Sequence, residues 1–471
     1  MRVMLINPPV LNGNPIVREG RCMQRKGAWT SLWPPLTLAT LASLLREKGF
    51  SVLARDYVAE ALTVDNVLND TKAFKPDMLV LNTVAASLYN DLDVANNIKS
   101  VNRSIFATAI GLQASGVPDS LLVSPFAVDA AIVGEPDIPV ARIADVLSVN
   151  GNLNEVEGIS YRKDGCTVNT GRVSEFIDID SLPMPAWEFF NLRNYTLPFS
   201  RKPFLLVTTA RGCPHTCEFC PIWIYYGRVP RLRSPERIAD EIEYDIEKFG
   251  VRDFLFWAES FTLNEIHVAG ICEEILRRNL KINWMCNSRV DNVNDQMLRL
   301  MKRAGCWLIG FGIESGSQRI LDSTRKGISL DQIRRTVKMS HSAGIVVVGH
   351  VIIGLPHDDE RSINETINFT RDVGLDFAQF YCAVPFPGSK LYDDARNNGW
   401  LKTGDWTMFE QNRSIVDYPE LSSGKIEKLR RRAIRSFYLR PASVWKLMRL
   451  VKTRGDMRSL FYSVREFLSW L

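Results

Sequence analysis

Short apolar runs alternate with segments of helical periodicity through the first 145 residues of the chain. Apolar runs at residues 2–7, 51–57, 77–83, 104–111 and 129–135 predict buried strands, and residues 35–49 carry Leu and Ala at helical spacing. Strands that are apolar throughout, with helices between them, are typical of a parallel sheet covered on both faces. We therefore predict a doubly wound, Rossmann-like α/β domain over residues 1–145.

A second alternating series begins near residue 204. Its apolar runs, each separated by a helical pattern, lie at residues 204–212, 253–260, 282–290, 307–315, 344–356 and 377–388. Six β/α units are too few for a closed eight-stranded barrel, so we predict a partial (β/α)6 barrel over residues 201–395. Residues 146–200 are expected to form a linker containing a hairpin that turns at Asp164-Gly165, and residues 396–471 a helical C-terminal region.

Polar and glycine-containing loops follow the predicted strands of the first domain. In parallel sheets of this kind, ligands bind beyond the carboxyl ends of the strands. That position is occupied here by Asn7, Pro8, Pro9, Thr83, Gly111, Gln113, Gly134 and Glu135. No G-x-G-x-x-G motif follows the first strand, so the sequence does not favour a dinucleotide as the ligand.

Composition and charge narrow the class of protein. The 471 residues are 46% hydrophobic and 24% charged, as in ordinary globular proteins, and the N-terminus lacks the apolar region of a signal peptide. We expect a cytoplasmic protein.

Residues 425–471 hold 13 Lys and Arg against 3 Asp and Glu, interleaved with large apolar residues. We interpret this region as a helical cap with a basic face, with peripheral membrane contact as the alternative and nucleic acid disfavoured.

Three of the nine cysteines lie within eight residues, at Cys213, Cys217 and Cys220, and the other six are expected to be buried hydrophobic side chains. A structural zinc site normally closes with four ligands in two pairs, and no second pair is present. A disulfide framework conflicts with a reducing compartment. The third alternative is an iron–sulfur cluster, in which three thiolates leave one iron with an open position for a substrate or cofactor.

The pattern C-x-x-x-C-x-x-C after the first strand of a partial barrel resembles the signature of the radical S-adenosylmethionine (SAM) enzymes. The resemblance implies that Cys213, Cys217 and Cys220 hold a 4Fe-4S cluster whose open iron chelates the amino and carboxylate groups of SAM. In that family, electron transfer from the cluster cleaves the sulfonium and forms a 5′-deoxyadenosyl radical. The protein supplies binding, orientation and exclusion of water.

The same resemblance covers the ends of the later barrel strands, in the segments WAES, GFGIESGS, HVIIGLP and VPFPGSKLY. It implies that Arg325 pairs with the SAM carboxylate, a task that suits a guanidinium fork. The full set of SAM contacts that it implies comprises Glu259, Asn287, Arg289, Glu314, Ser315, Arg325, Gly354 and Pro356.

The first domain is similar to the N-terminal half of the cobalamin-binding radical SAM enzymes, in the segments INPP, WPPLTLATLASLLREKGF, GLQASGVPDSLL and VGEPD. This implies cobalamin at the strand ends named above. The five histidines lie at residues 215, 267, 341, 350 and 357, so none can ligate cobalt from the first 200 residues. We expect cobalamin to bind without histidine ligation.

The two cofactors together imply a cobalamin-dependent radical SAM methyltransferase that acts on an unactivated carbon of a small-molecule, lipid or tetrapyrrole-like substrate. An external donor such as flavodoxin or ferredoxin would supply electrons. The alternatives are an oxidative cyclase or rearrangement enzyme, for example one that closes a ring on a tetrapyrrole, and a non-catalytic cobalamin sensor. Methylthiotransfer is disfavoured because only Cys22 and Cys166 precede the cysteine triad.

Overall fold

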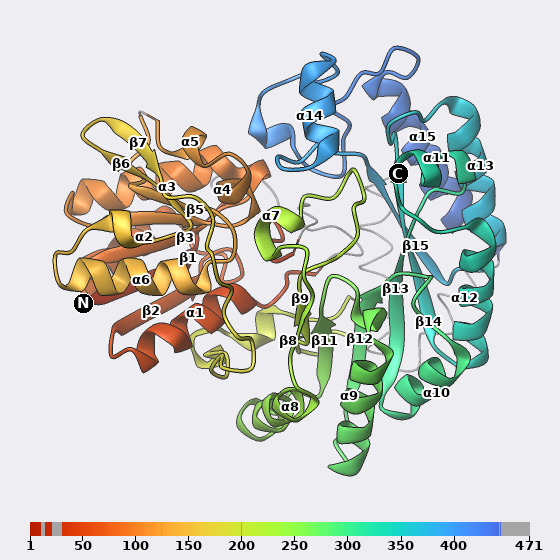
Figure 1. Ribbon diagram of the computed structural model, residues 1–471, viewed down its shortest axis with the longest axis horizontal. Coiled ribbons are helices and arrows are strands. Elements are labelled where there is room, and N and C mark those ends of the chain that lie inside the picture. The colour runs from red at the N-terminus through yellow and green to blue at the C-terminus, as the bar shows by residue number, and fades with distance from the viewer. Residues whose placement is uncertain (11–14, 21–30, 124, 199, 442, 444–471) are drawn as a thin grey trace.

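The structure, a computed structural model, contains a mixed N-terminal sheet and a parallel second sheet that lie side by side, with the segment that follows the cysteines between them (Figure 1). It describes residues 1–10, 15–20, 31–123, 125–198, 200–441 and 443. The N-terminal sheet is drawn in red to yellow and the second sheet in green to blue (Figure 1).

The N-terminal sheet has seven strands in the order β2-β1-β3-β4-β5-β6-β7, and its first five strands are parallel. This order reverses between β1 and β3, which is where doubly wound sheets bind ligands. The strands are β1 (Arg2–Asn7), β2 (Ser51–Asp56), β3 (Met78–Asn82), β4 (Phe106–Ile110), β5 (Ala130–Ile132), β6 (Ile159–Lys163) and β7 (Cys166–Asn169).

Helices cover both faces of this sheet because alternate residues of its buried strands point to opposite sides. Val3 and Leu5 of β1 pack in one apolar cluster with residues of α1 and α6, whereas Met4 and Ile6 pack in another with residues of α2 and α3. The doubly wound prediction is therefore confirmed. The helices are α1 (Leu36–Glu47), α2 (Val64–Phe74), α3 (Leu88–Val101), α4 (Leu112–Gly116), α5 (Pro118–Leu121) and α6 (Asp137–Ser148).

The predicted hairpin is β6 and β7, and it extends the N-terminal sheet by antiparallel pairing of β6 with β5. Asp164 and Gly165 make its turn, both with positive φ (49° and 79°), as a tight hairpin turn requires. The chain then runs back over α1, where Trp187 is fully buried and the amide of Ala186 donates to the carbonyl of Ala39 at 3.0 Å. The expected domain boundaries stay a prediction.

The second sheet has six parallel strands in the order β8-β11-β12-β13-β14-β15, which confirms the partial barrel. They are β8 (Phe204–Thr208), β11 (Asp253–Trp257), β12 (Asn283–Ser288), β13 (Cys306–Glu314), β14 (Val346–Ile353) and β15 (Phe377–Cys382). The short strands β9 (Ala210–Arg211) and β10 (Arg231–Leu232) pair beside it and flank α7 (Trp223–Tyr226).

Helices lie along the outer side of the barrel strands (Figure 1). They are α8 (Pro235–Phe249), α9 (Glu265–Arg277), α10 (Asp295–Arg303), α11 (Gln318–Ser323), α12 (Leu330–Ser342) and α13 (Glu360–Asp372). Ser234 caps the start of α8, because its side chain accepts from the amide of Arg237.

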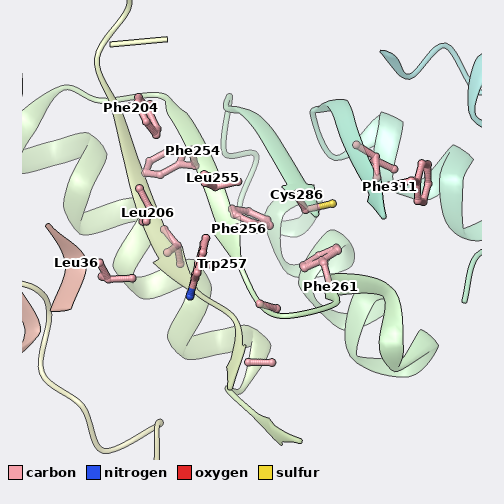
Figure 2. Close-up of a cluster of buried hydrophobic side chains, with 14 of the residues drawn as sticks. Leu36, Phe204, Leu206, Phe254, Leu255, Phe256, Trp257, Phe261, Cys286 and Phe311 are labelled. Atoms are coloured by element: carbon pink, nitrogen blue, oxygen red, sulfur yellow. The ribbon is translucent and has the colours of Figure 1, made fainter. Parts of the chain in front are cut away.

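One apolar core joins the two sheets. Figure 2 shows Phe204 and Leu206 of β8 beside Phe254, Phe256 and Trp257 of β11, with Leu36 of the N-terminal domain in the same cluster. Burial of these large side chains, at roughly 2 kcal/mol each, holds the base of the barrel against α1.

The described part of the C-terminal region is helical, with α14 (Lys390–Asn397) and α15 (Ser423–Tyr438). Ile426, Leu429 and Phe437 of α15 are buried in the core that includes β14 and β15, whereas Lys428 and Arg432 are exposed. This part is thus a cap with a basic outer face. Most of the basic segment, residues 444–471, lies outside the described residues.

The scattered cysteines divide into two kinds. Cys272, Cys286, Cys306 and Cys382 are buried as expected, but Cys166 is exposed because it lies on the edge strand of the hairpin. Cys22 lies outside the described residues. Within the part of the chain that the structure describes, no helix has the length and apolar character needed to cross a membrane.

Candidate active site

The three cysteines lie in the loop between β9 and α7, beyond the end of β8 (Figure 1). Gly212 starts this loop with φ of 96°, and a Cβ there would lie 2.4 Å from the carbonyl oxygen of Val229, so only glycine fits. The amide of Cys213 donates to the carbonyl of Gly227 at 3.3 Å, and that of Cys220 to the carbonyl of Cys217 at 3.1 Å. The backbone therefore brings the three thiols to one short turn.

Two buried cations lie next to these thiols. The Arg289 guanidinium is 3.8 Å from the sulfur of Cys217, and its charge also interacts with Cys213. Burial raises the pKa of the Cys217 thiol, and so does the proximity of Cys220, whereas the charges of Lys326 and Arg289 oppose the rise. These cations favour thiolate, the form in which cysteine binds metals.

Among the residues that the structure describes, no three His, Cys, Asp or Glu side chains are grouped as ligands of one metal ion. A cuboidal cluster distributes its thiolates over different irons, so three cysteines in one turn fit it without meeting at a single point.

The end of β11 contributes a carboxylate to this loop. Glu259 is buried, and its Oε2 accepts from the amide of Gly212 at 3.0 Å, directly before Cys213. The hydroxyl of Ser260 is also buried, and within the part of the chain that the structure describes it has no hydrogen-bond partner, which leaves it available to a ligand.

Arg289 lies just after β12 and is fixed from two sides. It forms a two-point ion pair with Asp291 at 2.9 and 2.8 Å, and it donates to the carbonyl of Lys326 at 2.7 Å. Burial works to lower the pKa of Arg289, but the pairing with Asp291 outweighs it and the pKa is raised. The guanidinium thus stays charged and stationary beside the thiols.

Sequence reasoning missed Lys326, whose side chain faces Glu314 at the end of β13. Its ammonium forms a buried ion pair with Glu314 at 2.7 Å. Ser315 is buried too, but its hydroxyl bonds to the hydroxyl of Thr366 at 3.0 Å and so anchors α13. A buried lysine one residue after an expected arginine gives no pattern that sequence reasoning could use.

Arg325 itself lies at the surface. Its side chain is 65% exposed and pairs with Glu218 of the cysteine loop at 3.2 Å. The structure therefore brings Glu314 and Lys326 to the site interior and leaves Arg325 on its outer side.

The loop after β14, which contains Gly354 and Pro356, is held from beneath by Asp358. The carboxylate of Asp358 accepts from the amides of Gly354 and Leu355, each at 3.0 Å. Burial raises the pKa of Asp358 to about 6. The carbonyl of Gly354 accepts from the hydroxyl of Tyr418 at 3.1 Å, so both ends of this glycine are fixed.

A second polar layer lies deeper in the barrel. Asn287 of β12 is 3.2 Å from the Nε2 of His350 on β14, and the hydroxyl of Tyr381 on β15 is 3.4 Å from the Nδ1 of His350. These side chains meet across Gly310 of β13, where a Cβ would lie 2.4 Å from the Oδ1 of Asn287. Asn287 thus belongs to this layer and not to the cysteine loop.

The carboxyl edge of the N-terminal sheet holds Asn7, Pro8 and Pro9 in a rigid, buried arrangement. Asn7 donates to Asp56 at 3.0 Å and accepts from Asn82 at 2.9 Å. The carbonyls of Pro8 and Pro9 accept from Arg18 and Asn90 at 3.3 and 2.8 Å, respectively. These prolines shape the edge through their backbone.

Thr83, Gly111 and Gln113 lie at the next strand ends. A Cβ at Gly111 would lie 2.3 Å from the carbonyl oxygen of Thr83, whose hydroxyl bonds to the carbonyl of Ile110. The Nε2 of Gln113 is buried, and none of the residues that the structure describes is its hydrogen-bond partner. Gly134 lies against α7. A Cβ at Gly134 would lie 3.6 Å from the carbonyl oxygens of Ile224 and Tyr225.

A small pocket connects this edge to the segment after the cysteines. Asn82, Gly111 and Glu19 line one side, and Tyr225 and Tyr226 of α7 line the other. Burial raises the pKa of Glu19 to about 7, although the hydroxyl and amide of Thr37 donate to its carboxylate. The pocket therefore lies between the carboxyl edge of the N-terminal sheet and α7.

Glu135 links the two domains. Glu135 and Asp137, at the start of α6, form buried ion pairs with Arg211 of β9, the Asp137 contact at 2.7 Å. Arg231 of β10 also pairs with Glu135. The cluster fixes the strand that leads into Cys213 to the N-terminal domain.

Comparison with known proteins agrees with this architecture. The signature of the Radical SAM superfamily matches residues 207–370. The chain is 32% identical over 408 residues to the uncharacterised methyltransferase PH0819 of Pyrococcus horikoshii, covering 87% of this chain and 88% of that protein. It is 27% identical over 402 residues to the anaerobic magnesium-protoporphyrin IX monomethyl ester cyclase of Rubrivivax gelatinosus, covering 84% and 70%.

Solved structures share the fold. The methyltransferase TsrM from Kitasatospora setae, with cobalamin and an iron–sulfur cluster bound, superposes with a TM-score of 0.69 at 16% identity, covering 91% of this chain and 84% of that one. The cobalamin-dependent enzyme OxsB, with aqua-cobalamin and SAM bound, gives 0.67 at 19% identity, covering 93% and 61%.

These matches define an enzyme of the radical SAM class with a Rossmann-like domain before the barrel. The chain belongs to the radical SAM family, as the sequence resemblance predicted, with PH0819 as a relative, and it shares the fold of the cobalamin-dependent enzymes TsrM and OxsB.

The residues present fit the groups that this family uses. Three cysteines beside two buried cations suit a cluster, and the hydroxyl of Ser260, which has no partner among the described residues, lies next to the buried Glu259. At the other edge, the buried amide nitrogen of Gln113 finds no hydrogen-bond partner among the described residues, which suits a polar ligand at the end of β4.

Proposed function

We propose that this enzyme is a cobalamin-dependent radical SAM methyltransferase acting on an unactivated carbon of a small-molecule, lipid or tetrapyrrole-like substrate. When bound, the cluster, SAM and cobalamin would supply a radical that activates the carbon and a methyl group to transfer to it. The observation that carries the proposal is the pocket between the N-terminal sheet and the segment after the cysteines, lined by Asn82 and Gly111 on the sheet and by Tyr225 and Tyr226 of α7.

Cys213, Cys217 and Cys220 would hold the 4Fe-4S cluster. Around it, opposite charges suit the two ends of an amino acid: the buried Glu259 carboxylate suits an ammonium, and Lys326 or Arg289 suits a carboxylate. SAM carries both groups. The loop of Gly354 and Pro356 would contact its adenosyl part, and Glu314, Ser315, Asn287 and Arg325 would support these contacts.

Cobalamin would lie against the N-terminal edge, near Gly111, Gln113 and Gly134. Asn7, Pro8, Pro9 and Thr83 would shape the floor of that site, and Glu135 would hold the site to the barrel. No histidine of this domain is available to cobalt, because the first histidine in the chain is His215. Water exclusion matters here because radical intermediates react with solvent.

Two relatives support different chemistries. The similarity to PH0819 favours methyl transfer, and it is the higher of the two identities, 32% against 27% for the cyclase. Oxidative ring closure on a tetrapyrrole is therefore the second candidate, because the cyclase covers 84% of this chain.

We place the enzyme in the cytoplasm, with an external flavodoxin or ferredoxin as electron donor and membrane contact through its basic C-terminal region.

The test begins with anaerobic reconstitution with iron and sulfide, which should give roughly four irons per chain. Reduced enzyme with SAM should release 5′-deoxyadenosine, and added cobalamin should give S-adenosylhomocysteine as well. The second product distinguishes methyl transfer from ring closure, which does not consume a methyl group.

Cys217→Ala should lose the cluster and both products. Cys166→Ser is the matched control, because Cys166 is exposed on the hairpin and should leave iron content unchanged. An intact cluster with no SAM cleavage would support the cobalamin-sensor alternative, and zinc in the anaerobically purified protein would refute the proposal.

A further inference from the structure

The outer tip of the cysteine loop reaches the protein surface. Pro214 and Thr216 are exposed, Cys217 and Cys220 are partly exposed, and Cys213 is buried. An electron carrier outside the protein can therefore approach the thiols at this tip.

Exposed cations surround the tip. Arg228 donates to the carbonyl of His215 at 3.2 Å, and Arg325 pairs with Glu218 at 3.2 Å. Lys390 begins α14, whose next residue, Leu391, donates its amide to the carbonyl of Glu218 at 2.9 Å. We name Arg172, Arg228, Arg325 and Lys390 together the loop rim.

The carboxylates beside the loop rim are already neutralised. Glu218 is only 12% exposed and pairs with Arg325, and Asp394 pairs with Lys390. The guanidinium groups of Arg172 and Arg228 both lie over the ring of Trp223, 4.7 and 5.1 Å from its centre, and this ring carries no charge. Four rim cations against these two carboxylates leave two positive charges, those of Arg172 and Arg228, so the rim presents a positive field to solvent.

An apolar surface completes this region. Val229 follows Arg228 and is 73% exposed, and Trp223, three residues after Cys220, is partly exposed. A small apolar centre bordered by like charges is the usual composition of a transient protein–protein contact, which needs speed more than affinity.

We propose that the loop rim docks an acidic one-electron carrier of the flavodoxin or ferredoxin class, and this proposal rests on the proposed function. One electron leaves the reduced carrier, which is oxidised, and enters the cluster at the loop, which is reduced. Complementary charge orients the carrier with its cofactor toward Pro214 and Thr216. Arg289 and Lys326 on the inner side favour arrival of the negative charge.

The test uses reconstituted holoenzyme carrying Arg172→Glu and Lys390→Glu, two rim residues that do not hydrogen-bond to the cysteine loop. The rate of 5′-deoxyadenosine formation is measured with reduced flavodoxin and, separately, with dithionite, which needs no docking site. We expect the flavodoxin-driven rate to fall about ten-fold or more at low salt while the dithionite-driven rate is unchanged. Arg361→Glu, 88% exposed on α13, is the matched control and should change neither rate.

Equal rates for variant and wild type with both reductants would overturn the proposal. Loss with both reductants would also overturn it, because the rim would then serve an anionic substrate or a cofactor. Fluorescence titration of oxidised flavodoxin measures docking without turnover: binding should weaken in the variant and with added salt. Failure of wild type to cleave SAM with dithionite would count against the proposed function alone, and the titration would still decide the docking site.

Discussion

At the residue scale, the neighbours Arg325 and Lys326 differ in where their side chains go. Arg325 has a left-handed backbone, with φ of 52°, and it follows the end of α11. The turn sends the Arg325 side chain outward to Glu218 and the Lys326 side chain inward to Glu314. The cysteine spacing could be read from the sequence because the motif is contiguous. The inward cation could not, because turn geometry decides which of two adjacent side chains is buried.

Lys326→Met should be strongly destabilising. It would leave the Glu314 carboxylate buried without its partner, and breaking a buried pair on one side costs about 3–5 kcal/mol. Chemical denaturation of the apoprotein measures this cost as the loss in free energy of unfolding. The double variant Glu314→Gln with Lys326→Met removes both charges and should recover much of the loss. A double variant as unstable as the single one would contradict the pairing argument.

At the element scale, β13 explains how polar side chains enter the barrel. Its glycines at 310 and 312 remove two side chains from the inner wall, and the space is used by Asn287 with His350 and by Glu314 with Lys326. Apolar runs predicted β13 and the other barrel strands well, because most of their residues are buried or half-buried. It said nothing of the His350 and Tyr381 layer, because polar residues at alternate positions also occur on strands that face solvent.

Gly310→Ala should disrupt this layer while the strand itself remains. The added methyl would lie 2.4 Å from the Oδ1 of Asn287 and 2.7 Å from the Nε2 of His350. Overpacking of this kind costs about 1–3 kcal/mol, so the midpoint of thermal unfolding should fall by several degrees. Gly404→Ala is the control, because nothing lies within 4 Å of a Cβ there and its φ is not in the left-handed region. An equal effect of the two substitutions would refute the proposed crowding.

At the scale of the whole molecule, the two sheets could be predicted from the sequence. The joint between them, by which we mean the ion pairs of Glu135 and Asp137 with Arg211, could not. Each sheet follows from its own apolar runs, but the contact of Glu135 and Asp137 with Arg211 joins residues more than 70 positions apart. A charged residue beside a strand end has many available partners, and its periodicity does not reveal which one it pairs with. Glu135 was expected at a ligand site because it follows β5, and the structure shows it within the interface between domains.

Arg211→Met should weaken both stability and the cluster. Glu135 would keep Arg231, but the buried Asp137 would lose the one ion pair described for it, at a cost of about 3 kcal/mol or more. Since Arg211 is two residues before Cys213, iron retention after reconstitution should also decline. Arg299→Met, at a side chain 64% exposed on α10, is the control and should leave both measurements unchanged. Normal iron retention in a destabilised Arg211→Met protein would show that the joint supports the fold alone.

The same joint limits how this enzyme can be recombined. Because acids from one half and guanidinium groups from the other neutralise each other out of water, neither half can be exchanged for a homologous module unless the matching charges are carried over with it. Chimeras that respect this pairing should mature with metal, and those that ignore it should accumulate as insoluble chains.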